Sequence, residues 1–259
     1  MHATWNALLA RERDVRAATS VALAVAVVLF LPVAAATWEV ERAAVPWIVA
    51  SAVLELAYFL LLTAAYQRSD LSLVYPIARG SAPILVLVGA ALAGATLGVW
   101  QAVGVVLVGA GVMLVRGFRG AVDRHGVLLS LAIGCTIAGY TLVDKEGIEH
   151  ASTFAYLELV LVPVAFATIA VQFATDGSRS MREALNWPVV VAGVLSFLAY
   201  ALALAALELA PAATVAAVRE TGILFAVALG AILLRERVSV VRVAGATVTV
   251  AGVALVALG

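Results

Sequence analysis

Two arginines lie inside long apolar stretches of the chain, 140 positions apart. Arg79 lies in LSLVYPIARGSAPILVLVGAALAG and Arg219 in PAATVAAVRETGILFAVALGAILL. Each follows the start of its stretch, Leu71 or Pro211, by eight residues, which is about 12 Å along a helix. A charge at that depth in a membrane is costly, so it normally faces a helix-bundle interior or a wet cavity and marks a pathway. The matching positions predict a transporter that arose by duplication.

The residues around Arg79 favour a binding site for an anion or a carboxylate. Tyr75, Pro76 and Pro83 flank it, and proline inside a span frees backbone carbonyls and opens the helix locally. An arginine beside an opened helix can hold a carboxylate through charge-assisted hydrogen bonds. The alternative is an ion pair that only ties two helices together. We favour the binding role, because a purely structural pair is costly in lipid.

Acidic residues within the apolar stretches are candidate partners for these arginines. Glu55 lies near the middle of SAVLELAYFLLL, where a carboxylate either pairs with an arginine or carries a proton. We expect the ion pair. Glu158 and Glu220 pose the same choice with less force, because Glu158 is near the start of its stretch. Glu220 adjoins Arg219 but points about 100° away from it on a helix.

Several aromatic residues and one amide complete the candidate set. Mid-span aromatic side chains can line a pocket, whereas those at span ends fit the interfacial belt of a membrane protein. Asn6 offers a donor and an acceptor, although capping or helix packing explains it equally well. The predicted substrate-binding residues are therefore Arg79, Tyr75, Glu55, Tyr58, Arg219, Tyr140, Trp5 and Asn6, with Tyr200 as a further aromatic candidate.

The composition supports a membrane protein and excludes several other classes. The chain is 64% hydrophobic and only 12% charged, against about 25% charged in a soluble domain. Its formal net charge is +0, so we expect no nucleic-acid partner. Cys135 is the single cysteine and three histidines are scattered, so we expect no metal and no cofactor. No P-loop or catalytic motif is present, which predicts that the chain is not an enzyme.

The elements that must position these residues are membrane-spanning helices. A span needs about 20 apolar residues, and the first ten residues of the chain are too few. Either they are the end of a first helix that begins upstream, which we favour, or the protein starts with a half-helix. We expect an all-α integral membrane bundle of nine full spans plus this truncated helix. The predicted spans are 17–37, 45–66, 71–94, 99–116, 126–144, 152–174, 187–208, 211–234 and 238–258.

Counting the truncated helix gives ten helices in two repeats of five, at 1–120 and 121–259. Gly104 and Gly111 match Gly245 and Gly252 at an offset of 141. Because five is odd, two tandem units must have opposite orientations in the membrane. The alternate loops at 11–16, 68, 116–124, 179–182 and 235–242 hold 12 of the 16 basic residues, and the positive-inside rule makes that side cytoplasmic.

Four segments of the chain resemble a known family. HATWNALLAR, YPIARGSAPILVLVGA, GYTLVDKEG and LGAILLRERVSVVRVAGATVTVAGVALV are similar to the EamA-like branch of the drug/metabolite transporter superfamily. The resemblance implies ten helices in two inverted repeats around a central substrate cavity. It carries over to Tyr75, Pro76, Arg79 and Pro83 on the fourth helix, to Trp5 and Asn6 on the first, and to the turn at 235–239.

Two features depart from the pattern of this family. The first-half copy of the 235–239 turn, at 94–98, lacks the acidic residue. The family implies cytoplasmic termini, whereas the basic loops with ten spans place both termini outside, and the two orientations stay open.

These observations predict a secondary transporter, an exporter of a small polar metabolite such as an amino acid, that works by alternating access around the central cavity. We expect it in the inner cell membrane as a multi-pass protein, with a small-molecule substrate and the lipid bilayer as partners. A homodimer stays open. The alternative from another class is an integral-membrane enzyme acting on a lipid or isoprenoid substrate, but the acidic residues are dispersed here rather than clustered. A membrane scaffold without transport has no need of the two buried arginines.

Overall fold

The structure is a computed structural model of the 259-residue chain. It describes residues 5, 8, 9, 12–68, 71–96, 98–116, 124–225 and 239–258. Within these ranges the regular structure is helical, apart from one isolated antiparallel bridge between Val40 and Ala151. The predicted all-helical class is confirmed.

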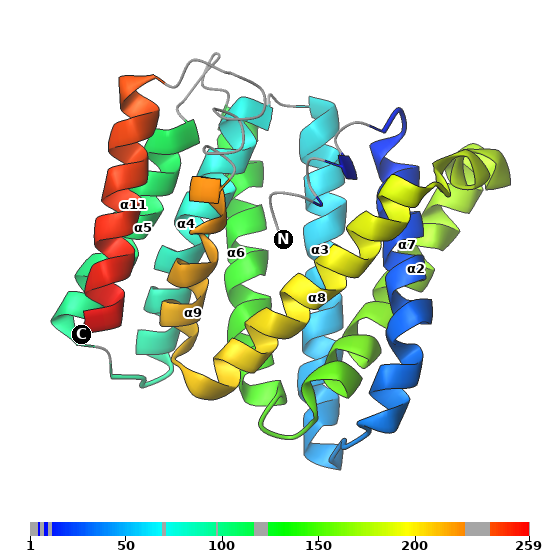
Figure 1. The fold of residues 1–259 in the computed structure, drawn as a ribbon, viewed down its shortest axis with the longest axis horizontal. Helices are drawn as coiled ribbons and strands as arrows, with labels where there is room; N and C mark the ends of the chain where they lie inside the picture. Colours follow the sequence, from blue (N-terminus) through cyan, green and yellow to red (C-terminus); the bar gives the residue numbers. More distant parts are fainter. Residues whose placement is uncertain are drawn as a thin grey trace. The chain divides into compact units, whose positions relative to one another are not determined.

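The helices follow one another closely along the chain (Figure 1). They are α2 (Val15–Ala36), the 3-10 helix η1 (Arg42–Ala44), α3 (Val45–Arg68), α4 (Leu71–Leu92), α5 (Val99–Arg116), α6 (Arg124–Gly147), α7 (Thr153–Ala184), α8 (Trp187–Leu209), α9 (Ala212–Arg219) and α11 (Val240–Leu258). Trp5, Leu8 and Leu9 are also helical. The rest of the predicted truncated helix lies outside the described residues.

Six described helices are long and apolar enough to cross a membrane. They cover 15–36, 42–62, 124–147, 153–184, 187–209 and 240–258, and shorter apolar helices cover 77–92 and 99–115. Large apolar side chains on their outer faces are exposed, such as Val53, Phe166 and Val250, as expected for a surface covered by lipid. The count of nine full spans is not confirmed by these helices and stays a prediction.

The helix α7 is longer than predicted, and it bends. The span predicted at 152–174 continues to Ala184, with a non-helical residue at Gly177 (φ 71°, ψ −173°). Positive φ is a conformation that glycine adopts without a steric penalty. Residues 153–176 measure about 36 Å as a helix, enough to cross a hydrocarbon core of about 30 Å. The polar turns after Gly177 therefore need not lie in the apolar layer.

The helix within the span predicted at 211–234 is broken among the described residues, and the span itself stays a prediction. The helix α9 ends at Arg219, Glu220 and Thr221 form a turn, and helical residues resume at 222–225. The Thr221 hydroxyl donates to the carbonyl of Val218 over 2.7 Å, which offers the backbone an alternative to the helical ladder. Gly222, a poor helix former, comes next. Residues 226–238 lie outside the described ranges.

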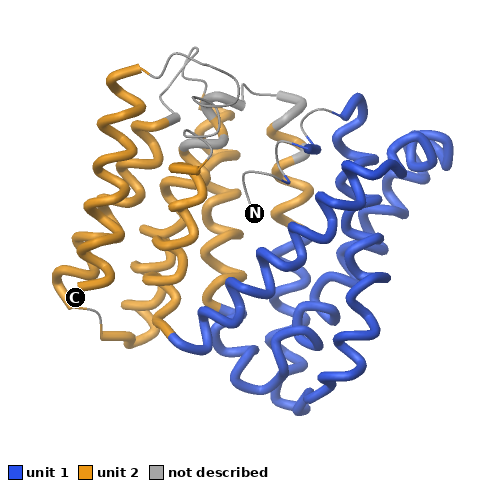
Figure 2. Tube along the Cα trace, in the orientation of Figure 1, with its two compact units in different colours: residues 1–56, 143–209 blue, residues 57–142, 210–259 orange. Residues whose placement is uncertain are grey.

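Helix contacts divide the chain into two compact units (Figure 2). Unit 1 consists of residues 1–56 and 143–209, and unit 2 of residues 57–142 and 210–259. Each unit contains parts of both predicted repeats, 1–120 and 121–259, so the spatial units and the predicted repeats are different divisions of the chain.

In unit 1, α2 packs against α7 and α8. Gly193 of α8 brings the two backbones together, because a Cβ there would overlap the carbonyl of Ala22. Three rings join the same helices further along. Phe30 of α2 stacks on Phe197 of α8 with 4.2 Å between ring centroids, and Phe154 of α7 lies 6.3 and 6.2 Å from these two rings. We call these three residues the phenylalanine cluster.

In unit 2, α5 and α11 lie side by side and run antiparallel (Figure 1). Gly104 faces Gly252, and Gly111 faces Gly245. A Cβ at any of the four would come within 2.8 Å of a backbone oxygen or nitrogen of the other helix. Small residues at these positions allow the helices to pack backbone against backbone. We call the four residues the glycine seam. The helix α4 packs against α5 and α9.

Candidate functional site

Arg79 forms a buried ion pair with Glu220 in unit 2. Its Nη2 atom lies 2.8 Å from Oε1 of Glu220, and the two side chains are 17% and 7% exposed. Arg79 comes from α4 and Glu220 from the turn that ends α9. Of the three acidic residues weighed as partners, Glu220 is therefore one that the structure brings to Arg79.

The expectation that prolines open the helix around Arg79 is wrong for its own helix. The helix α4 is continuous from Leu71 to Leu92, although Pro83 has no N–H to donate to the Arg79 carbonyl one turn earlier. The interruption lies instead on the partner side, directly after Arg219, which is the last residue of α9 and is partly buried. The ion pair thus joins a continuous helix to an interrupted one.

A second polar cluster lies in unit 1 around Asp144, near the end of α6. Its carboxylate is buried and accepts hydrogen bonds from three hydroxyl groups. Ser51 of α3 and Tyr156 of α7 donate to Oδ1 over 2.6 and 3.0 Å, and Tyr200 of α8 donates to Oδ2 over 2.7 Å. We call these four residues the Asp144 network. Hydrogen bonds from several donors stabilise a carboxylate that is removed from water.

Neighbouring contacts hold the Asp144 network in place. Lys145 donates from Nζ to the carbonyl of Leu207 over 2.7 Å and so ties α6 to α8. Gly147 leaves room for the ring of Tyr156, which a Cβ there would overlap. Glu55 lies one helical turn after Ser51, on the same side of α3, and is also buried. Glu55 belongs to unit 1 and both arginines to unit 2, so its pairing with an arginine stays a prediction.

Sequence reasoning missed Asp144. It is the last residue of the span predicted at 126–144 and precedes Lys145 and Glu146, a pattern typical of the start of a polar loop. Tyr156 and Tyr200 could have pointed to it, because a buried tyrosine hydroxyl normally finds a hydrogen-bond partner. Two tyrosines within apolar stretches therefore predict a buried acceptor such as Asp144. Tyr200, proposed as a pocket aromatic, is a donor in this network.

The other candidates lie in different places. Tyr58 and Tyr140 meet edge to face in unit 2, with 6.3 Å between ring centroids and an 81° angle. Trp5 packs against an apolar cluster in unit 1 that includes Ala18 and Val189. Tyr75 belongs to α4, but its side chain lies outside the described residues. The prediction for Asn6 also falls outside them.

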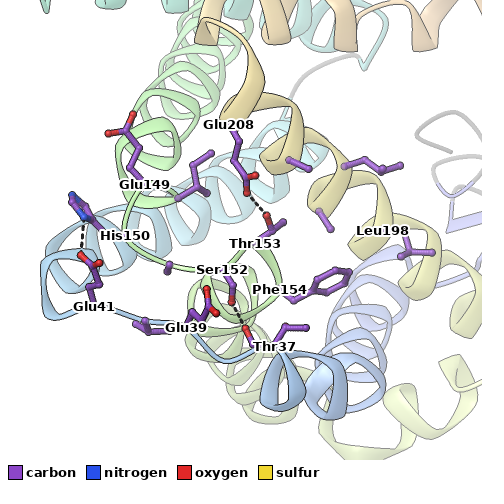
Figure 3. A pocket seen from close by; sticks show the side chains of 16 residues that line it. Thr37, Glu39, Glu41, Glu149, His150, Ser152, Thr153, Phe154, Leu198 and Glu208 are labelled. Carbon is purple, nitrogen blue, oxygen red and sulfur yellow. Dashed lines mark hydrogen bonds and ion pairs between the residues drawn. The ribbon is translucent and has the colours of Figure 1, made fainter.

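Unit 1 also contains an open pocket of about 900 Å³ at the loop end of its helices (Figure 3). The loop after α2 and the loop before α7 form one side, joined by the bridge between Val40 and Ala151. None of the predicted substrate-binding residues whose side chains are described lines it. The lining carries four carboxylates and a histidine, namely Glu39, Glu41, Glu149, Glu208 and His150.

Repeated apolar helices with ionisable side chains buried among them define a multi-pass α-helical membrane protein. The family model described as the EamA-like transporter family matches residues 124–258, more than half of the chain, and the chain belongs to this family. This confirms the resemblance seen in the sequence motifs. It also places the chain among transporters, in agreement with the expectation that it is not an enzyme.

The fold is shared with a solved structure described as "Crystal structure of protein". The two chains are 15% identical and superpose with a TM-score of 0.80, covering 98% of this chain and 94% of the other. At this identity the likeness concerns the fold alone. No curated protein sequence matches the chain significantly.

Proposed function

We propose that this chain is a secondary transporter of the inner cell membrane that exports a small polar metabolite, such as an amino acid. Transport proceeds by alternating access around a central cavity. The observation that carries the proposal is the buried ion pair between Arg79 and Glu220 at the interruption after α9. In transporters, interrupted helices supply backbone and side-chain groups to substrate sites within the membrane.

The ion pair has the chemistry to bind a zwitterion. The guanidinium of Arg79 can hold the carboxylate of an amino acid with two parallel hydrogen bonds, and Glu220 can accept from its ammonium group. An entering zwitterion then replaces each half of the pair with an equivalent partner. Neither buried charge is left alone during the exchange, which avoids the large cost of an uncompensated charge.

The glycine seam supports the proposal of two inverted repeats, 1–120 and 121–259. With the offset of 141 positions between the repeats, Gly104 corresponds to Gly245, and Gly111 corresponds to Gly252. The contact between Gly104 and Gly252 therefore maps onto the contact between Gly245 and Gly111, and both are present. A pair of antiparallel helices that maps onto itself in this way is what a two-fold relation between repeats produces.

Uptake of a radiolabelled L-amino acid mixture into proteoliposomes tests the role of Arg79. The variant Arg79→Lys keeps the charge but loses the two-pronged geometry. We expect KM to rise about tenfold or more, because one charge-assisted hydrogen bond contributes about 1.5–3 kcal/mol. Unchanged transport by Arg79→Lys and Arg79→Ala would show that this residue does not bind the substrate.

A paired substitution separates binding from stability. Arg79→Ala removes the cation 2.8 Å from the buried Glu220 carboxylate and should lower the free energy of unfolding by about 3 kcal/mol. The double variant Arg79→Met with Glu220→Leu removes both charges and should regain most of this stability, yet remain inactive. A double variant that transports like the wild type would reduce the pair to a structural contact.

A further inference from the structure

Glu158 differs from every other acidic residue described in the interior of unit 1. It lies on α7, six residues after the cap Ser152, and is 2% exposed. Neither carboxylate oxygen has a hydrogen-bond partner among the described residues, and no described ion pair includes it. An ionised carboxylate without partners in an apolar interior is so costly that such a group takes up a proton instead.

The titratable groups on the surrounding helices are occupied elsewhere. On α7 itself Tyr156 donates to Asp144 of α6, and on α8 Tyr200 does the same. Glu208 of α8 accepts from Thr153 over 2.6 Å. The helix α2 carries a charge only at Arg16, in its first turn, and Asp14, which caps that end, is joined to Gln172 near the far end of α7. None of these side chains forms a described ion pair with Glu158.

Glu158 lies close along α7 to one residue that lines the open pocket of unit 1. Phe154 lies one helical turn before it, on the same face of α7, and belongs to the phenylalanine cluster. Phe154 also lines the open pocket at the loop end of unit 1 (Figure 3). One lining residue of the pocket is therefore about 6 Å from Glu158 along the helix.

The pocket attracts cations. Its described lining includes four carboxylates but no lysine or arginine. Lys145, outside the lining, lies 4.0 Å from Glu149, and His150 lies 3.2 Å from Glu41. The carboxylates still outnumber these cationic partners, and an excess of charge of one sign raises the local concentration of the opposite ion. A metal cation needs several oxygen ligands, whereas the described residues hold no group of His, Cys, Asp and Glu side chains fit for a metal. A proton needs only one carboxylate oxygen. Of the two kinds of cation, the proton is therefore the one that Glu158 can bind.

We propose that Glu158 is a proton-binding site, reached from the acidic pocket past the phenylalanine cluster, that couples transport to the proton gradient. The coupling rests on the proposed transport function, whereas proton binding itself does not. The pocket adjoins loops with few basic residues, which the positive-inside rule places outside the cell. A proton that enters there and leaves to the cytoplasm would drive export of the substrate by exchange.

Infrared spectroscopy of the detergent-solubilised full chain tests proton binding without any substrate. A protonated carboxyl in an apolar site gives a carbonyl-stretch band that a carboxylate lacks. We expect this band at neutral pH in the wild type and its loss in Glu158→Gln, which has nearly the same shape. The control Glu183→Gln, an exposed carboxylate paired with Arg179 on the same helix, should keep the band. No band in the wild type, or an unchanged band in Glu158→Gln, overturns the proposal.

A second measurement needs no variant. Dicyclohexylcarbodiimide is an apolar reagent that adds a protonated carboxyl across its carbon–nitrogen double bond. The resulting O-acylisourea rearranges by an acyl shift from oxygen to nitrogen into a stable N-acylurea. We expect mass spectrometry to find the adduct on Glu158 at neutral pH and less of it at high pH. Modification of exposed carboxyls while Glu158 stays unmodified counts against the proposal.

Transport in proteoliposomes then tests the coupling. With a radiolabelled L-amino acid mixture, we expect Glu158→Gln to lose accumulation driven by an imposed pH gradient and to keep exchange at equal pH. Retained gradient-driven accumulation overturns the coupling. A wild type that shows the infrared band and the adduct but moves no amino acid supports the proton site and overturns the proposed substrate class instead.

Discussion

Arg79, which is partly buried, and the buried residues Asp144 and Glu158 show three ways of holding an ionisable group away from water. Arg79 has an opposite charge at 2.8 Å, and Asp144 has three hydroxyl donors. Glu158 has neither among the described residues. The first arrangement can exchange its partners for those of a substrate, the second fixes helices to one another, and the third favours a bound proton. Environment, rather than residue type, separates these roles.

The Asp144 network should contribute measurably to stability. Asp144→Asn replaces one acceptor oxygen with an amide donor, so at least one hydroxyl loses its acceptor. We expect the free energy of unfolding to fall by about 2 kcal/mol, in the range for a buried polar group left unsatisfied. Thermal unfolding in detergent, followed by tryptophan fluorescence, measures the change.

A double-mutant cycle provides the control for this prediction. Tyr200→Phe removes a single donor and should cost less, about 1 kcal/mol. If the Asp144→Asn change deprives Tyr200 of its acceptor, the double variant costs less than the sum of the two single changes. A protein with Asp144→Asn that melts at the wild-type temperature would contradict the structural role of the network.

At this scale the sequence indicates which residues are unusual, but it does not identify their partners. Arg79 stands out because a charge interrupts an apolar stretch. Its partner Glu220 is 141 positions away, and only the packing of α4 on α9 brings the two together. Asp144 escaped notice because its chain neighbours are polar, while its three donors come from three other helices.

At the scale of helices, the glycine seam makes a direct prediction. Gly252→Leu places a side chain against the backbone of α5, where even a Cβ would lie 2.7 Å from the Gly104 carbonyl oxygen. The helices must then separate. We expect a loss of about 1–3 kcal/mol, the usual cost of overpacking, measured as a lower melting temperature. The matched control Ala251→Leu changes the adjacent exposed residue and should leave that temperature unchanged. Equal melting of both variants would exclude tight packing at the seam.

Most helix boundaries follow from the sequence because the thickness of the membrane constrains the apolar length. The spans predicted at 17–37, 45–66 and 187–208 appear as α2, α3 and α8 with ends shifted by about two residues or less. The break after Arg219 could not be predicted in this way, because apolar residues follow on both sides of it and the whole stretch keeps the length of a span. It depends on local hydrogen bonding at Thr221 and on the partner of Glu220. Hydropathy measures neither.

At the scale of the whole molecule, the five-plus-five scheme fixes the side on which each loop lies. Four predicted spans separate the loops at 116–124 and 235–242, so both must lie on one side of the membrane. Single cysteines at the exposed positions Arg124 and Ser239, in a Cys135→Ala background, should react with an impermeant thiol reagent from the same side. Their charge predicts the cytoplasm, so labelling should require opened or inside-out vesicles.

Two other labelling results for the cysteines at positions 124 and 239 would change the topology. Labelling from opposite sides implies an odd number of spans between them, which removes the inverted repeat. Labelling of both in intact cells keeps the repeat and reverses the orientation, which places the termini in the cytoplasm as the family resemblance implies.

The Asp144 network also has a consequence for the order in which the chain is built. Ser51 is synthesised before Asp144, whereas Tyr156 and Tyr200 leave the ribosome after it. Until α8 has entered the membrane, Asp144 therefore lacks the hydrogen bond that Tyr200 donates to its Oδ2 atom in the mature protein. A carboxylate in that condition is costly in lipid and favours the interface with water. The end of α6 can thus settle at its final depth only after α8 is inserted, which makes α8 the segment that completes the assembly of this unit.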